Sequence, residues 1–89
     1  MEFEWDDAKA ARNLARHHID FLDAIEVFLD PFRVELEDDR AEYGELRLKT
    51  VGMVNGTVTV VVFTPRGKRT RIISARKAKP NERRAYHEG

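Results

Sequence analysis

Asn55-Gly56 is the sequence feature that most limits the folds open to this chain. A two-residue type I′ turn needs a positive φ at both central positions, and Asn-Gly meets that need better than most pairs. Residues 46–53 before it alternate between two faces, and residues 57–64 after it are almost all β-branched. Such segments are typical of strands, the second of them covered on both faces. The dipeptide therefore predicts a β-hairpin.

A second turn extends this hairpin to a meander. Residues 65–68 (Pro-Arg-Gly-Lys) favour a turn, and residues 70–75 follow as a third strand. Pro80 suits the first turn of a closing helix that runs to about His87, with Glu82 near the positive end of the helix. We therefore expect three antiparallel strands followed by a helix.

The N-terminal part predicts a strand, two helices and another strand. Residues 1–5 alternate as a short strand, residues 32–36 alternate again, and residues 37–45 form a charged, exposed loop. Asp6 or Asp7 caps the first helix, and Asp20 caps the second. The apolar residues at helical spacing are Ala8, Ala11, Leu14 and Ala15 in the first helix, and Phe21, Ala24, Ile25, Phe28 and Leu29 in the second.

Together these segments predict one α+β domain over residues 1–89. We expect a small antiparallel sheet, made of the three-stranded meander plus the N-terminal strand, with two N-terminal helices and one C-terminal helix. The chain has no cysteine, which excludes disulfides and Cys-based zinc sites. The acidic opening has no secretory signal, and the longest apolar run, Val60–Phe63, is too short to cross a membrane. A cytoplasmic location is therefore expected.

The charges are sorted along the chain although their sum is zero. Residues 1–45 carry 14 acids and five bases, and residues 46–89 carry 11 bases and two acids. Such asymmetry is typical of chains that contact nucleic acids or membranes. One interpretation is that the basic half meets phosphate while the acidic half packs behind it. The other is that the two halves fold together and neutralise each other.

The densest cationic segment is residues 68–79, which include the third meander strand. On a strand, Arg69 and Arg71 share one face. Guanidinium groups on one face repel each other unless an anion lies among them, and the phosphates of RNA fit the planar, bidentate Arg side chain. The alternative is that carboxylates of the N-terminal helices cover this face.

Four further residues could carry chemistry. His17, at the end of the first helix where the dipole favours the charged imidazole, is a candidate general acid or base, or else a C-capping residue. Glu45 and Arg47 lie on the same side of the chain where a strand begins. They form either a structural ion pair or a general base, Glu45, that Arg47 holds in place. Tyr86 could stack on a base or pack in the core. No metal-binding cluster or phosphate-binding glycine loop is evident.

Several of these segments resemble the BrnT family, the toxin halves of bacterial type II toxin–antitoxin modules. The resemblance covers nearly the whole chain and is most specific at residues 71–78 (Arg-Ile-Ile-Ser-Ala-Arg-Lys-Ala), then at residues 3–6 (Phe-Glu-Trp-Asp). The other matching residues are Lys9, Asn13, Arg16, His17, Phe21, Ala24, residues 27–31, residues 44–47, Gly52, Glu82, Arg83 and Tyr86. The chain departs from the family at His18, where glycine is usual, at Asp7, where proline is common, and at Leu46, where many members are polar.

The resemblance implies a RelE-like fold and an endoribonuclease that cuts RNA and arrests growth. It also implies a BrnA-type antitoxin with a ribbon-helix-helix part, through which the complex binds operator DNA. Such enzymes need no metal or cofactor, and the 2′-hydroxyl of RNA is their nucleophile. The alternatives are a RelE-fold toxin with a target other than RNA, such as a topoisomerase, and a non-enzymatic module that only binds a partner.

The predicted catalytic residues are His17 and Glu45 as general acid or base, with Arg47, Arg71 and Arg76 stabilising the phosphate. The predicted RNA-binding residues are Lys49, Arg69, Lys77, Arg83 and Tyr86. On this assignment Arg76→Ala should abolish activity and leave the fold intact.

Overall fold

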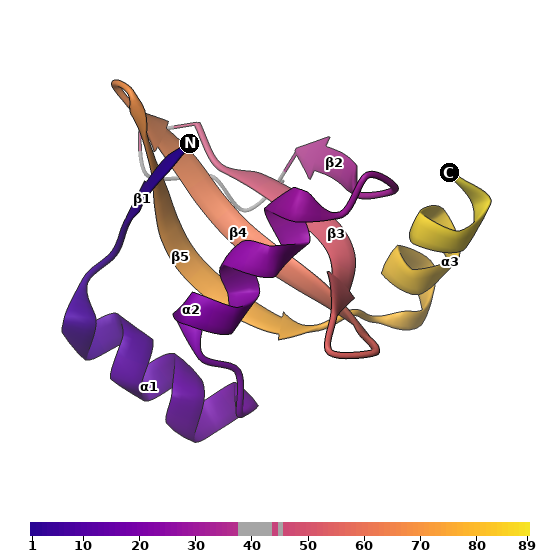
Figure 1. The fold of residues 1–89 in the computed structure, drawn as a ribbon, viewed down its shortest axis with the longest axis horizontal. Helices are drawn as coiled ribbons and strands as arrows, with labels where there is room; N and C mark the ends of the chain where they lie inside the picture. Colours follow the sequence, from indigo (N-terminus) through magenta and orange to yellow (C-terminus); the bar gives the residue numbers. More distant parts are fainter. Residues whose placement is uncertain (38–43, 45) are drawn as a thin grey trace.

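The structure, a computed structural model, describes residues 1–37, 44 and 46–89. Nine elements follow one another in these residues (Figure 1). They are β1 (Glu2–Glu4), α1 (Asp7–His17), α2 (Phe21–Ala24), the 3₁₀ helix η1 (Ile25–Leu29), β2 (Val34–Glu37), β3 (Leu48–Val54), β4 (Thr57–Arg66), β5 (Arg69–Lys77) and α3 (Pro80–Glu88). The α+β class is confirmed. The expected loop at 37–45 lies almost wholly outside the described residues.

The strands form one five-stranded sheet in the order β1-β5-β4-β3-β2. Neighbours from β2 to β5 are antiparallel, but β1 runs parallel to β5. The expectation of a wholly antiparallel sheet is therefore wrong at this edge. The strand expected over 32–36 forms as β2 and joins the sheet, which was expected to hold only the meander and the N-terminal strand. The direction of β1 depends on how α1 and α2 carry the chain across the sheet, which local periodicity does not encode.

The β3–β4 hairpin is confirmed. β3 ends at Val54, β4 begins at Thr57, and the two turn residues have positive φ, 49° at Asn55 and 79° at Gly56. The second turn is tighter than expected, because β4 continues through Pro65 and Arg66 and only two residues connect it to β5.

The second helix differs from its expected form. Instead of one helix over 21–29, α2 makes a single turn and η1 continues it as a 3₁₀ helix. η1 lies so close to β3 that a Cβ atom on Gly52 would come within 2.9 Å of Val27 Cγ1. Just after η1, the carboxylate of Asp30 accepts the backbone N–H of Met53 at 2.9 Å. The conformation of this segment is therefore determined by its contacts with β3 rather than by its own helical periodicity.

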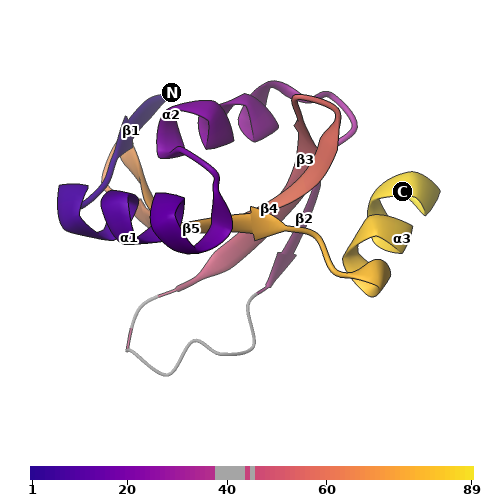
Figure 2. The same ribbon diagram turned by 90° about the horizontal axis from the view of Figure 1, so that it is seen from below.

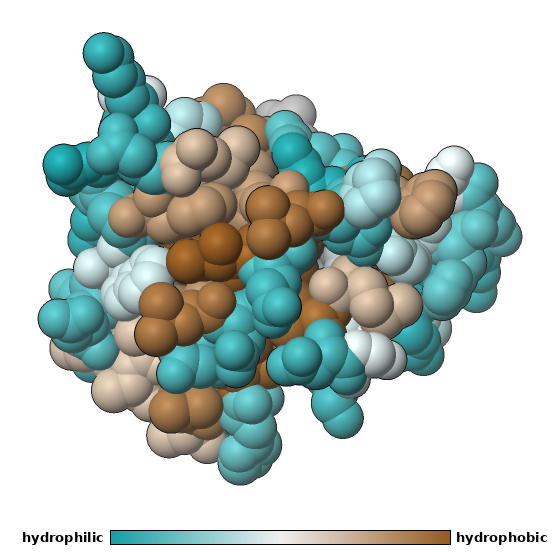
Figure 3. Space-filling view, in the orientation of Figure 1, coloured by the Kyte–Doolittle hydropathy of each residue, from teal (hydrophilic) through white to brown (hydrophobic). Residues whose placement is uncertain are grey.

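The two faces of the sheet are covered differently (Figure 2). On the first face, α2 and η1 bury Phe21 and Val27 against Val61 and Phe63 of β4. On the opposite face, α3 contributes Tyr86 to a smaller cluster of buried valines on β3 and β4. Apolar residues gather on the side seen in Figure 3. The exposed apolar side chains of the described residues include Leu22, Leu29 and Phe32. Among the described residues, no helix is long and apolar enough to cross a membrane.

α1 packs against the edge of the sheet with a polar residue. Asp6 caps the helix as expected, accepting the N–H groups of Ala8 and Lys9. The regularly spaced apolar residues do not form the buried face, since Leu14 is 45% exposed and the three alanines are exposed too. Asn13 is the buried residue of α1. The helix thus faces β5 with Asn13.

The Asn13 side chain takes the place of a neighbouring strand at the free edge of β5. β1 pairs with β5 only at residues 69–71. Further along β5, Asn13 Nδ2 donates to the carbonyl of Ala75 at 2.9 Å, and Asn13 Oδ1 accepts its N–H at 3.1 Å. Asn13 Nδ2 also donates to the carbonyl of Ile19 at 3.1 Å. One amide therefore fixes α1, the turn after it and β5 together.

Asn13→Ala is expected to lower the free energy of unfolding by about 2 kcal/mol, because it leaves buried backbone groups of Ala75 without their partners. Urea denaturation measures the change. Asn81→Ala, an exposed asparagine on α3, is the matched control and should change stability far less. Equal, small effects of the two substitutions would contradict this role for Asn13.

Candidate functional site

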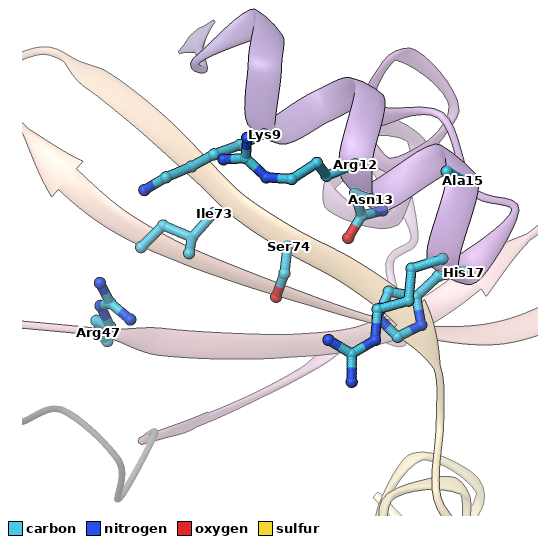
Figure 4. Close-up of a pocket in the computed structure, with 9 residues that line it drawn as sticks. Lys9, Arg12, Asn13, Ala15, His17, Arg47, Ile73 and Ser74 are labelled. Atoms are coloured by element: carbon cyan, nitrogen blue, oxygen red, sulfur yellow. The ribbon is translucent and has the colours of Figure 1, made fainter.

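An open groove of about 810 Å³ lies between α1 and β5, with Arg47 on its far side (Figure 4). Lys9, Arg12 and Arg16 line it from α1, at positions that share one side of a helix. Ile73 and Ser74 line it from β5. Figure 4 shows the Lys9 and Arg12 side chains extending from α1 across the strands.

The groove is cationic. None of the described residues that line it carries a carboxylate, whereas four are Lys or Arg. A concave surface lined by one sign of charge focuses the electrostatic potential and attracts ligands of the opposite sign. Because Asn13 fixes α1 against β5, the three α1 cations are held on a rigid wall. The groove is therefore suited to a polyanion.

β5 has a bulge where it lines the groove. Phe63 pairs with Ile72 and Val62 pairs with Ser74, so Ile73 is an extra residue with no partner on β4. A bulge bends its strand and redirects the neighbouring side chains. Here it brings both Ile73 and the Ser74 hydroxyl to the groove.

His17, the last residue of α1, provides the groove with a group that can exchange protons. Burial lowers the pKa of its imidazole, and the neighbouring charges of Arg16 and Arg76 lower this pKa further. Burial and these neighbouring charges therefore outweigh the helix dipole, which was expected to favour the charged imidazole. His17 is neutral near pH 7 and can accept a proton.

The structure brings two predicted catalytic residues, His17 and Arg47, into this groove. Glu45 lies outside the described residues. Arg71 donates to the Glu4 carboxylate of β1 at 2.6 Å, and Arg69 lies 3.9 Å from the same group. Glu4 is thus a carboxylate on the strand beside the basic strand β5, a pairing that the charge pattern alone did not identify.

Two further predicted site residues, Arg76 and Lys49, form hydrogen bonds to the carboxylate of Glu82. This carboxylate is only 2% exposed, and Arg76 binds it through two hydrogen bonds of 2.8 and 2.9 Å. Lys49 Nζ and the N–H of Lys79 donate to it as well. The bonds from Arg76 are the main reason that the pKa of Glu82 falls to about 2. Arg76 and Lys49 therefore attach α3 to the sheet.

The remaining predicted RNA-binding residues lie apart from the groove lining. Lys77 lines a second, smaller cavity. Arg83 donates to the carbonyl of Ala78 at 2.8 Å. The Tyr86 hydroxyl donates to the Asp30 carboxylate at 2.6 Å, which raises the pKa of Tyr86. Among the described residues, no three His, Asp or Glu side chains gather as a metal site.

Sequence reasoning missed the α1 cations and Ser74. Lys9, Arg12 and Arg16 are three of only five bases in the acidic half, and they recur at helical spacing. This spacing is the signal that could have identified them. Ser74 gave no such signal, because the bulge that turns it to the groove is visible only in the strand register. The groove cations come largely from the acidic half, so dividing the chain by charge does not describe its surface.

His18 adopts the backbone conformation that glycine favours. Its φ is 60°, and its N–H closes α1 on the carbonyl of Leu14 at 2.9 Å. The turn that the resemblance places at a glycine therefore forms with histidine, and His17 ends the helix regularly. Positive φ is costly for residues with a Cβ atom.

We expect His18→Gly to raise the free energy of unfolding, by up to about 1 kcal/mol, because glycine removes this strain at a helix C-terminus. Thermal unfolding of the two proteins measures the difference. His18→Ala keeps the Cβ atom and is the control that should not gain stability. A loss of stability in the glycine variant would show that the His18 side chain makes a contribution larger than the strain.

A small α+β domain with a groove lined by cations and a histidine belongs to the class of proteins suited to bind polyanions. The chain belongs to the BrnT family, since a family model described as the ribonuclease toxin BrnT of type II toxin–antitoxin systems matches residues 5–82. The family is thus one of toxins that act on RNA and are paired with an antitoxin. None of the curated proteins compared with the chain matches it.

Proposed function

We propose that this protein is a growth-arresting endoribonuclease that cleaves RNA without a metal ion, with the 2′-hydroxyl of the substrate as nucleophile. The observation that carries the proposal is the groove that His17 lines together with Lys9, Arg12, Arg16 and Arg47. It combines a proton acceptor with the cations that a phosphate backbone requires.

In the proposed reaction, His17 takes the proton of the 2′-hydroxyl. The 2′-oxygen then attacks the adjacent phosphorus, and the bond from phosphorus to the 5′-oxygen breaks. The products are a 2′,3′-cyclic phosphate and a 5′-hydroxyl, the latter after the leaving oxygen takes a proton from water or from Glu45. Neutral His17 suits the first step because only the unprotonated imidazole accepts a proton.

The cations divide into two groups under this proposal. Arg47 and the α1 cations bind the RNA backbone and stabilise the charge that grows on the phosphate. Arg71 and Arg76 act mainly by holding Glu4 and Glu82, since their guanidinium groups make short hydrogen bonds to these carboxylates. Their direct contact with phosphate, like that of Lys49, would require these pairs to open.

The antitoxin that the family implies is, in this proposal, a BrnA-type protein with a ribbon-helix-helix part. Operator DNA would be bound by that part rather than by the toxin itself. The cationic groove supports the proposal that the antitoxin presents a segment rich in carboxylates, because such a segment competes with RNA for the same cations.

A 2′-deoxy substitution at one cleaved position of an RNA oligonucleotide is expected to abolish cleavage at that bond alone, because it removes the nucleophile. Cleavage elsewhere should continue in the presence of EDTA, and mass spectrometry should find 2′,3′-cyclic phosphate ends. The all-RNA oligonucleotide is the matched control.

Three results would contradict the proposal. Cleavage at the deoxy position would exclude the 2′-hydroxyl as nucleophile. Growth arrest with intact RNA after induction would indicate a target other than RNA. No effect on growth when the chain is expressed without an antitoxin would indicate a module that only binds a partner.

A further inference from the structure

A second cavity adjoins the groove at His17. Its volume is about 250 Å³, and it lies between the turn after α1 and the β3–β4 hairpin. His17 lines both the groove and this cavity, so a ligand in one is close to a ligand in the other. Cavities for drug-sized ligands begin at about 300 Å³, so this one suits a smaller group such as a single flat ring system.

The lining of the cavity differs from that of the groove. Asp23 of α2 contributes a carboxylate, and Asn55 and Thr57 of the hairpin contribute an amide and a hydroxyl. Ile19 and Val54 contribute apolar walls. A carboxylate acceptor, an amide and a hydroxyl that both donate and accept, and apolar walls suit a heterocycle with N–H donors better than they suit phosphate, because a carboxylate repels phosphate. Lys77 adds one cation beside them.

We propose that this cavity binds an unpaired guanine base of the nucleotide next to the scissile phosphate, and so sets the sequence preference of cleavage. The proposal rests on the ribonuclease function above. Single-stranded RNA is read by its unstacked bases, through hydrogen bonds to their Watson–Crick edges and contacts with their faces. A base in this cavity places its own backbone at His17 and in the cationic groove.

The Asp23 carboxylate selects guanine among the four bases. Guanine presents a ring N–H and an amino group side by side, which match the two oxygens of a carboxylate. Adenine and cytosine present an amino group beside a ring acceptor, and uracil presents its N–H between two carbonyls. An acceptor-only side chain therefore pairs fully with guanine alone.

The first test compares the cut sites of three proteins on an RNA of mixed sequence, mapped by sequencing the ends. Wild type should prefer guanine next to the cut. In Asp23→Asn the preference for guanine next to the cut should fall roughly tenfold to a hundredfold, because the amide replaces one acceptor by a donor. Glu26→Gln removes the same charge from the exposed carboxylate that follows on η1, outside the cavity, and should keep the wild-type preference. Identical cut-site profiles for Asp23→Asn and Glu26→Gln would overturn the proposal.

The second test does not require cleavage. Guanosine 3′-monophosphate and the three other 3′-monophosphates are titrated separately into the full chain, and NMR follows the amides of Asn55 and Thr57. We expect the guanine nucleotide to bind at least tenfold more tightly than the others. Asn55→Gly, which keeps the positive φ of the turn, should weaken binding without unfolding the hairpin.

The outcomes separate this proposal from the proposed function. Cleavage with no base preference, together with equal affinities for the four nucleotides, would overturn the guanine site and leave the ribonuclease standing. No cleavage of any RNA would overturn the ribonuclease, and selective binding of the guanine nucleotide would then still support the cavity as a guanine site.

Discussion

His17→Ala is expected to slow RNA cleavage by about 10²–10⁴-fold, the range that a positioned general base contributes. The imidazole is half-buried at the end of α1, where its pKa is lowered and its neutral form predominates near pH 7. Alanine favours helix, so α1 should remain intact. Single-turnover cleavage of a labelled RNA measures the rate, and circular dichroism confirms the fold. His87→Ala, which removes an exposed imidazole from α3, is the matched control.

The pH profile identifies which role His17 plays. As general base it must be neutral, so the rate rises with pH through the pKa of His17. Because that pKa is lowered, the midpoint should lie below the usual value of about 6.5. If His17 were instead the general acid, the rate would fall as pH rises through the same pKa. A profile that His17→Ala leaves unchanged would exclude both roles.

Glu82→Gln is expected to lower the free energy of unfolding by about 3–5 kcal/mol, as happens when one partner of a buried ion pair is removed. The carboxylate binds Arg76 twice, Lys49 once and the N–H of Lys79. Glutamine keeps the shape but leaves two cations without their counter-charge. Urea denaturation at neutral pH measures the loss. Glu88→Gln, an exposed glutamate of the same helix, should change stability by much less.

The acid dependence of stability provides an independent check. The pKa of Glu82 is about 2 in the folded protein, against an ordinary 4.5. A lowered pKa contributes stability that is complete above the unfolded value and is lost as pH falls from about 4.5 to 2. The difference corresponds to about 3 kcal/mol. Glu82→Gln should remove most of this dependence, and a variant with the wild-type acid dependence would contradict the assignment.

The same contacts change the meaning of the Arg76→Ala experiment. The sequence led to the expectation that this variant loses activity with the fold intact, whereas the structure shows Arg76 bound twice to buried Glu82. We therefore expect Arg76→Ala to lose stability as well, so its loss of activity alone does not identify a phosphate contact. The α1 cations offer cleaner variants, because among the described residues Lys9, Arg12 and Arg16 form no salt bridge.

Sequence reasoning succeeded where structure depends on near neighbours. Asn55-Gly56 fixed the β3–β4 hairpin through the φ angles that it permits. Asp6 and Asp20 cap the helices that they were expected to cap, and Pro80 begins α3. In each case the residues that decide the conformation are within a few positions of one another.

The candidate site was only partly predictable. His17 and Arg47 were identified by residue type, and both line the groove. Lys9, Arg12 and Arg16 were counted as part of an acidic half, although their helical spacing was visible. The roles given to Arg71 and Arg76 assumed open cations, but Glu4 of β1 binds Arg71 from 67 residues away and Glu82 of the following helix binds Arg76. Charge sorted along a chain does not predict which charges meet in space.

The sequence by itself determined the meander and the starts of the helices, because periodicity, caps and turn residues act over a few positions, and its motifs indicated the family. Only the tertiary structure decided that β1 runs parallel to β5 and that α1 lies along the edge of β5. The physical reason is visible in Asn13, whose partner Ala75 is 62 residues away. No local preference favours that contact. It forms because a free strand edge needs hydrogen bonds, and the helix that supplies them also brings its cations to the groove.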